Sequence, residues 1–124
     1  MSAKATRQVF GETIAKLGEK NPNIVVLDAD LSKSTKSDIF AKKFPERFFE
    51  MGIQEANMVG VAAGMANAGK IPFICSFSCF ITGRFDQIRL SSPTATPMSA
   101  SSAATRAWAS ARTATASRVW RTSR

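Results

Sequence analysis

The sequence contains no histidine, no tyrosine and only two cysteines in 124 residues. Without histidine, the chain lacks the commonest general acid–base group and the commonest metal ligand. Cys75 and Cys79 stand four residues apart with no second pair, so they make a poor zinc site. We expect two buried free thiols in a reducing compartment. The polar N-terminus and the short apolar runs predict a cytoplasmic protein with no membrane partner.

Acidic residues are missing from the last third of the chain, where the positive charge is concentrated. Residues 1–90 carry 12 Lys and Arg against nine Asp and Glu, whereas residues 91–124 carry five Arg and no acid. The net charge of +8 therefore depends largely on the tail. The excess positive charge lies in the tail, so the charge of the folded part does not require a nucleic-acid partner, and we expect none.

The composition changes sharply at residue 91. All nine Phe, all seven Gly and every Leu and Ile lie at or before residue 90. The tail is mostly Ala, Ser, Thr and Arg without helical or strand periodicity, so we expect residues 91–124 to be disordered. A nucleic-acid-binding tail is a weaker alternative, because lysine, glycine and regular aromatic spacing are absent. The chain is thus predicted to have one folded domain, residues 1–90.

Helical and strand patterns alternate along residues 1–90. Thr6 is a candidate helix cap, Phe10, Ile14 and Leu17 share one helix face, and Gly18 is expected to end that helix. The predicted order is helix 6–17, strand 24–27, helix 36–44, strand 47–51, helix 55–68, strand 71–76 and helix 78–90. This alternation predicts an α/β fold with a parallel sheet. Ligands then bind beyond the carboxyl ends of the strands, in loops that begin at residues 28, 51 and 77.

These loops carry a family resemblance. Residues 48–66, F-F-E-M-G-I-Q-E-A-N-M-V-G-V-A-A-G-M-A, resemble the pyrimidine-binding domain of transketolases, in particular the separate C-terminal subunits of split transketolases. Weaker matches lie on both sides of this stretch, in the same order along the chain as in the family. They are A-T-R at 5–7, V-L-D-A-D-L-S at 26–32, K-I-P-F at 70–73, F-S-C-F at 77–80 and D-Q-I-R at 86–89. The resemblance covers residues 4–90 and implies a partial thiamine-diphosphate-binding domain.

The resemblance implies a catalytic role for Glu55. In that family a glutamate hydrogen-bonds the aminopyrimidine ring of thiamine diphosphate, and the enzyme transfers a two-carbon ketol unit between sugar phosphates. Glu55 stands at the matching position, between Gly52-Ile53 and Asn57-Met58. The alternative is a first-turn helix acid favoured by the helix dipole.

Five further residues match family positions. Phe77 and Phe80 match aromatic residues that surround the aminopyrimidine, although they could be ordinary core residues. Asp30 matches an acidic residue near the cofactor, or it is a solvent-facing acid at a strand end. Arg7 and Ser34 match contacts to the sugar phosphate of the substrate, although an arginine in a first helical turn is often solvated.

Other parts of the family's site are missing. The family holds the diphosphate and a divalent metal such as Mg²⁺ with a G-D-G…N-N motif on another domain, and no such motif occurs in this sequence. The family's acid–base histidines are missing as well. The resemblance therefore implies an N-terminal transketolase subunit and a second copy as partners. Alone, the chain is expected to be inactive.

The tail is also expected to be out of frame. Permitted codons for Thr105 onward, read one nucleotide earlier, give H-A-G-V-G-V-G-E-D-G, which resembles the family's next motif. We therefore expect a truncated, frameshifted fragment. Two alternatives stay open. One is a fragment of a 1-deoxyxylulose-phosphate synthase-type enzyme, which has a histidine where this chain has Ala56-Asn57. The other is a non-catalytic α/β binding module with a basic tail.

Overall fold

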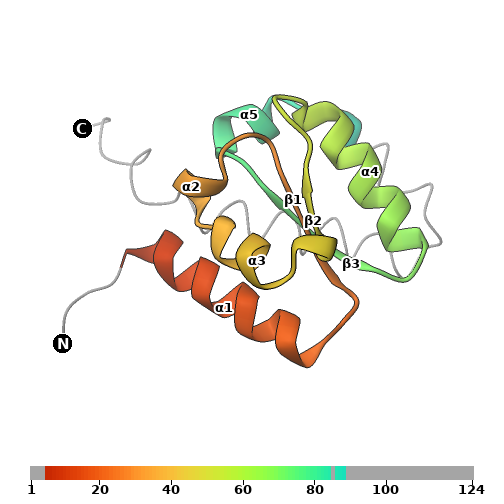
Figure 1. The fold of residues 1–124 in the computed structure, drawn as a ribbon. Coiled ribbons are helices and arrows are strands. Elements are labelled where there is room, and N and C mark those ends of the chain that lie inside the picture. Colours follow the sequence, from red (N-terminus) through yellow and green to blue (C-terminus); the bar gives the residue numbers. More distant parts are fainter. Residues whose placement is uncertain (1–4, 85, 89–124) are drawn as a thin grey trace.

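The computed structural model describes residues 5–84 and 86–88. They form a three-stranded parallel sheet with helices on both faces (Figure 1). The α/β fold class predicted from the sequence is confirmed. The predictions for residues 91–124, namely disorder and a shifted reading frame, lie outside the described residues.

The sheet has the order β2-β1-β3, with β1 in the centre. Its strands are β1 (Ile24–Asp28), β2 (Phe48–Glu50) and β3 (Ile71–Cys75). Every residue of β1 is buried, as its continuous apolar run predicts for a central parallel strand. Asp28 pairs with Glu50 on one side and with Cys75 on the other. The carboxyl ends of all three strands therefore meet at one edge.

Alternate residues of β1 enter two separate cores. Val25 and Leu27 pack with Met58, Ala62 and Ile74 beneath α4 (Glu55–Asn67) and α5 (Ser78–Thr82). On the other face, Ile24 and Val26 pack with residues of α1 (Thr6–Lys20) and α3 (Asp38–Lys43). Figure 1 shows α1 and α3 on one side of the sheet and α4 on the other. The strand period of two thus fills both layers.

The first helix differs in detail from the prediction. Thr6 is its first helical residue and Ala5 occupies the cap position without a side-chain bond, so the predicted Thr6 cap is wrong. The helix continues past Gly18 to Lys20, so Gly18 does not end it. A Cβ at Gly18 would lie 2.6 Å from Cε2 of Phe40, which shows that the glycine permits close packing instead. Leu17 is exposed, because the buried face turns toward Ala15 and Gly18.

Arg47 caps the end of α1 from across the fold. It ends the 3₁₀ turn η1 (Pro45–Arg47), and its Nη1 donates hydrogen bonds to the carbonyl oxygens of Gly18 (3.1 Å) and Asn21 (3.2 Å). Its guanidinium also lies over the Phe44 ring, 3.9 Å from the centroid. One cation therefore pairs the Gly18 carbonyl group at the end of α1 and adds a second donor to the Asn21 carbonyl, which also accepts the N–H of Ile24.

The predicted helix 36–44 is observed as α3, but an additional short helix precedes it. A four-residue helix α2 (Ser32–Thr35) comes first, and Lys36 then adopts a left-handed conformation with φ 67°. Helix α3 follows and ends before Pro45, as expected from its ring. The break at Lys36 lies between two hydroxyl residues, Thr35 and Ser37, which are drawn toward the sheet by a buried carboxylate described below.

The remaining helices follow the predicted order with one shortening. Helix α4 ends at Asn67, and Gly69 turns the chain with φ 82°, close to the predicted end. Helix α5 ends at Thr82 instead of continuing unbroken, and residues 86–88 are helical again. Cys75 is buried but Cys79 is exposed, so the expectation of two buried thiols is wrong for Cys79. Within the described ranges, no helix has the length and apolar character needed to cross a bilayer.

Candidate functional site

The carboxyl edge of the sheet gathers most of the predicted site residues. The loops that leave β1, β2 and β3 contain Asp30, Glu55 and Phe77 at or near their ends. Figure 1 shows α5 and the first turn of α4 together at this edge. Parallel strands place their C-terminal loops side by side, so the topology brings together residues far apart in sequence.

Glu55 is a buried carboxylate at the start of a helix. It is 6% exposed and is the first residue of α4. The hydroxyl of Ser76, which follows β3, donates a hydrogen bond of 3.0 Å to Oε1 of Glu55. The positive end of the helix dipole also favours a negative charge there. A carboxylate has about four acceptor positions, so capacity for a ligand remains after the Ser76 bond.

Two exposed aromatic rings follow Ser76, the residue that bonds to Glu55. Phe77 follows Ser76 directly, and Phe80 lies one turn later in α5. Their exposed fractions are 38% and 49%, and their ring centroids are 6.0 Å apart. Both are too exposed to be core residues, so the core alternative is wrong in this chain. Aromatic surface left open at a sheet edge suits a planar ring ligand.

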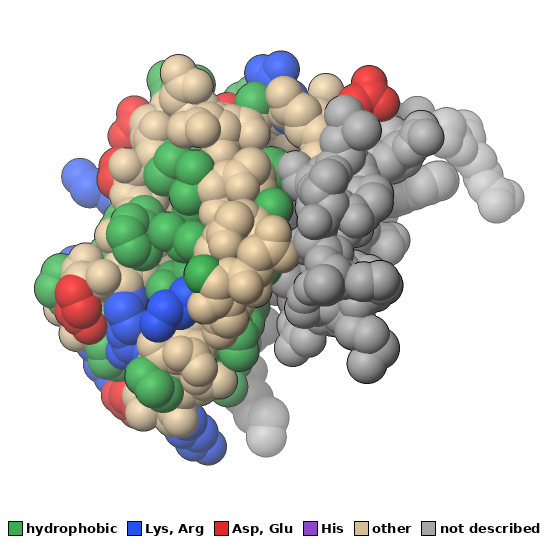
Figure 2. Space-filling view, turned by 90° about the vertical axis from the view of Figure 1, so that its right-hand side faces the viewer, with side chains coloured by type: hydrophobic (Ala, Val, Ile, Leu, Met, Phe, Trp, Pro, Cys, Tyr) green, Lys and Arg blue, Asp and Glu red, His purple; other side chains and the backbone are tan. Residues whose placement is uncertain are grey.

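Hydrophobic exposure extends beyond these rings. Ile53, in the loop between β2 and α4, is 79% exposed, and Phe49 of the edge strand β2 is 36% exposed. Figure 2 shows hydrophobic side chains gathered on the side of the molecule where α4 lies. Exposed apolar side chains in this number are typical of a surface that contacts a ligand or another chain.

Asp30 is exposed and has a left-handed backbone, with φ 58°. Its N–H donates a 2.7 Å hydrogen bond to Oε1 of Glu50, the last residue of β2. The N–H of Gly52 donates to the same oxygen at 3.1 Å. The structure therefore places Asp30 at the site edge, joined to the loop that leads to Glu55.

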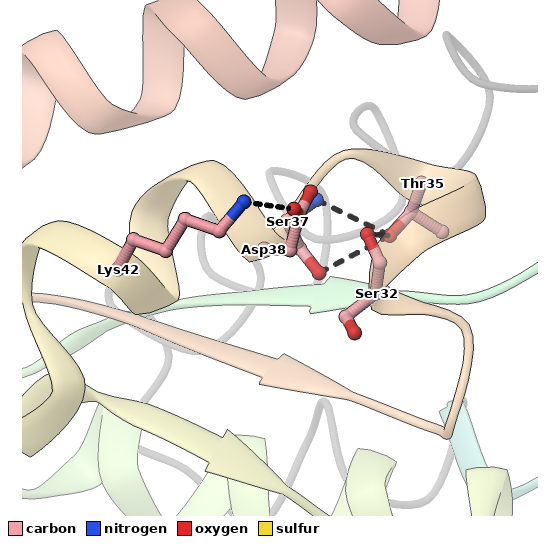
Figure 3. Close-up of polar contacts among 5 residues, drawn as sticks. All are labelled: Ser32, Thr35, Ser37, Asp38 and Lys42. Carbon is pink, nitrogen blue, oxygen red and sulfur yellow. Dashed lines mark hydrogen bonds and ion pairs between the residues drawn. The ribbon is translucent and has the colours of Figure 1, made fainter.

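Asp28 organises the segment that carries Ser34. It is fully buried, and its Oδ1 accepts the N–H of Leu31 at 2.6 Å. Its Oδ2 lies in hydrogen-bond contact with the hydroxyls of Ser37 (2.7 Å) and Thr35 (3.0 Å). Figure 3 shows the Thr35 hydroxyl between Ser37 and Ser32. This bonding wraps the chain around Asp28 and accounts for the break between α2 and α3.

Burial raises the pKa of Asp28 above its ordinary value, and the charge of Glu50 adds to the rise. The hydrogen bonds from Ser37, Leu31 and Thr35 act in the opposite direction because they stabilise the carboxylate. Burial also raises the pKa of the Cys75 thiol, and the nearby Asp28 charge raises it further. The middle of this edge is therefore a poorly solvated environment.

Arg7 and Ser34 belong to helices that touch each other. Arg7 is exposed near the start of α1, Ser34 is half-buried in α2, and the two helices are in contact. A Cβ at Gly11 would lie 2.4 Å from the Lys36 carbonyl oxygen, so the two segments approach closely there. Residues four apart share a helix face, which puts Arg7 on the face of α1 that meets this segment. Their role in phosphate binding stays a prediction.

Three residues of this edge were not identified from the sequence: Asp28, Glu50 and Ser76. Asp28 and Glu50 share a signal that could have found them, since each is an acid within one residue of the carboxyl end of a predicted strand, 24–27 or 47–51. Ser76 precedes the aromatic Phe77 but has no distinctive pattern. Among residues 5–84 and 86–88, no three His, Cys, Asp or Glu side chains form a group that could hold a metal ion.

Comparisons with known proteins agree with this geometry. Residues 2–110 match the family "Transketolase, pyrimidine binding domain". A protein of Methanocaldococcus jannaschii described as a transketolase C-terminal section is 58% identical over 81 residues, which are 65% of this chain and 26% of that protein. Human transketolase is 46% identical over 87 residues, 69% of this chain and 14% of the relative. This chain therefore spans a minor part of these relatives.

A solved structure described as a split gene transketolase, inactive beta4 tetramer, has a similar fold. Its TM-score is 0.66 at 57% identity, and the match covers 73% of this chain and 30% of that one. The similarity therefore extends from sequence to the arrangement of strands and helices. On the family match and these relatives, the chain belongs to the transketolase pyrimidine-binding domain family.

Proposed function

We propose that this chain is the pyrimidine-binding part of a cytoplasmic transketolase, which uses thiamine diphosphate to transfer a two-carbon ketol unit between sugar phosphates. The observation that carries the proposal is the buried Glu55 carboxylate at the start of α4, which is bonded to Ser76 directly before the exposed rings of Phe77 and Phe80. Family membership supplies the chemical class, and this edge of the sheet supplies matching side chains.

The residues present fit the aminopyrimidine end of thiamine diphosphate. Glu55 would hold a proton between its carboxylate and a ring nitrogen, in a setting where water has limited access. Phe77 and Phe80 would lie against the ring and exclude water from it. Asp30 would add an acidic group at the rim. The bound cofactor would supply the electron sink for making and breaking a carbon–carbon bond.

The partners are part of the proposal. An N-terminal transketolase subunit would hold the diphosphate and its Mg²⁺, and a second copy of this chain would complete the assembly. A solved relative is described as inactive when it is a beta4 tetramer, which supports a need for another kind of subunit. Arg7 and Ser34 would contact the phosphate of the sugar substrate from α1 and α2.

Isothermal titration with thiamine diphosphate and Mg²⁺ tests the proposal. The chain should bind the cofactor when mixed with the N-terminal section of a split transketolase, and much more weakly alone. Glu55→Leu should lower the affinity about tenfold, because a ring nitrogen loses its partner in a poorly solvated site. Glu55→Gln retains a hydrogen-bonding group and should lose less affinity. In any assembly that turns over, the same Gln variant should slow ketol transfer far more than it weakens binding.

Glu46→Gln is the matched control. Glu46 is an exposed glutamate in η1, before the amino end of β2 and so away from the carboxyl ends of the strands. Its Oε1 lies 3.4 Å from Nε of Arg47. This variant should bind thiamine diphosphate like the unmodified chain. Absence of binding in the presence of the N-terminal section, or equal affinities for Glu55→Leu and the control, would refute the proposed function.

A further inference from the structure

Glu50 joins two loops of the candidate site through a single oxygen. It is the last residue of β2 and lies opposite Asp28 in the sheet register. Its Oε1 accepts the backbone N–H of Asp30 at 2.7 Å and that of Gly52 at 3.1 Å. One N–H belongs to the loop after β1 and the other to the loop after β2. The carboxylate therefore fixes the distance between these loops.

Both donors have a left-handed backbone. Asp30 has φ 58° and Gly52 has φ 69°, the left-handed region that non-glycine residues rarely adopt. For Asp30 this conformation is unfavourable unless its surroundings stabilise it. The hydrogen bond to Glu50 supplies such stabilisation because it can form only when the Asp30 N–H turns toward β2. The two turns are thus shaped around the same acceptor.

The turn at Gly52 leads directly into α4. The N–H of Gln54 donates to the Gly52 carbonyl oxygen at 2.7 Å, and the N–H of Met58 donates to the Gln54 oxygen at 2.8 Å. Glu55 is the first residue of the helix that this chain of bonds begins. A shift of Gly52 would therefore shift the start of α4 and the carboxylate that it carries.

We propose that Glu50 is a positioning residue, which holds Asp30 and Glu55 in a fixed relation by accepting hydrogen bonds from both loops. The inference rests on the proposed function, in which Asp30 and Glu55 face the same cofactor. Its role depends on the acceptor oxygen more than on the negative charge. Asp28, the neighbouring acid, bonds to Leu31, Thr35 and Ser37 and so holds the opposite side of the same loop.

Two substitutions of Glu50 distinguish the effect of its hydrogen-bond acceptor from the effect of its negative charge. Glu50→Gln keeps a carbonyl oxygen in the place of Oε1 and removes the charge. Glu50→Met keeps the length of the side chain and removes the strong acceptor. Because Glu50 is exposed, neither change buries an unpaired polar group of its own. Glu46→Met, on the exposed η1 turn, is the control for replacing a surface glutamate by methionine.

Hydrogen exchange measured by NMR reports on the two loops without any ligand. In Glu50→Met, the amides of Asp30 and Gly52 should exchange about tenfold faster, the change expected when a charge-assisted hydrogen bond is lost. The amide of Leu31, which donates to Asp28, should be unaffected. Glu50→Gln should retain most of the protection at both sites. Unchanged exchange at Asp30 and Gly52 in Glu50→Met would overturn the inference.

Titration of thiamine diphosphate into the complex with an N-terminal section gives the second readout. Glu50→Met should bind about tenfold more weakly and Glu50→Gln close to the unmodified chain. Equal affinity of Glu50→Met and the Glu46→Met control, or equal losses in the Gln and Met variants, would overturn the positioning role while the proposed function stands. If the unmodified complex does not bind, the proposed function fails, and amide exchange alone decides whether Glu50 holds the loops.

Discussion

Replacing Gly11 by alanine should separate α1 from the segment that carries Ser34. A Cβ at this position would lie 2.4 Å from the carbonyl oxygen of Lys36 and 2.9 Å from Cδ1 of Ile39. Ordinary contacts of this kind begin at 3.4 Å, so the backbones must move apart by about an ångström. The obstacle is a backbone atom between α2 and α3, which cannot rotate away as a side chain could.

The magnitude follows from two opposing effects. Alanine in a helix interior stabilises by ~1 kcal/mol relative to glycine. Overpacking usually costs ~1–3 kcal/mol, and a fixed backbone neighbour favours a value at or above the upper end. We expect a net loss of ~2 kcal/mol for Gly11→Ala, which would lower the melting temperature by roughly 10 °C.

Urea unfolding followed by far-ultraviolet circular dichroism measures this loss. Circular dichroism is chosen because it reports on the described helices and strands themselves, whereas both tryptophans, Trp108 and Trp120, lie outside the described residues. Gly64→Ala is the matched control, because Gly64 is an interior residue of α4 with no described atom within 4 Å of an added Cβ. It should stabilise by ~0.5–1 kcal/mol. If Gly11→Ala were as stable as Gly64→Ala, the close approach of α1 and Lys36 would be refuted.

Three further outcomes are expected. Because burial raises the pKa of Asp28, the folded state binds its proton more tightly than the unfolded chain, so this group lowers the stability as the pH rises from about 4 to the raised pKa. Asp28→Asn should flatten the urea-unfolding profile over that range, and an unchanged slope would contradict it. Arg47→Lys should lose ~2 kcal/mol, because a lysine cannot span the Gly18 and Asn21 carbonyl groups as a guanidinium does; equal stability would show that the two bonds contribute little. Ser76→Ala should cost ~1–3 kcal/mol in urea unfolding by leaving the buried Glu55 carboxylate without its donor, and a Ser76→Thr variant, which keeps the hydroxyl, should lose less.

Periodicity was sufficient to predict the order of the elements but not all of their ends. The apolar run at 24–27 predicts the central strand because a parallel strand buried on both faces has no polar alternation. Gly18 was misread because a glycine that ends a helix and a glycine that admits Phe40 look the same in one sequence. The short helix α2 and the turn at Lys36 were missed since they depend on hydrogen bonds from Thr35 and Ser37 to Asp28, seven and nine residues away in the chain.

The candidate site was predictable where a motif carried it. Glu55 lies in the G-I-x-E-x-N-M run, and the structure buries it at the expected helix start. Glu50 and Ser76 act by hydrogen bonds to groups brought close by the parallel sheet, and such pairs have no fixed spacing in sequence. The roles of Arg7, Ser34, Asp30, Phe77 and Phe80 in binding stay predictions.

The reactivities of the two thiols can be compared to measure local opening of the sheet. Cys75 is buried in β3 and Cys79 is exposed four residues later. Burial raises the pKa of the Cys75 thiol, so this sulfur reacts with an alkylating reagent only when β3 exposes it to water. Cys79 reacts in the closed state and calibrates the reagent on the same peptide. The ratio of the two alkylation rates therefore measures how often β3 opens locally, without unfolding of the whole domain.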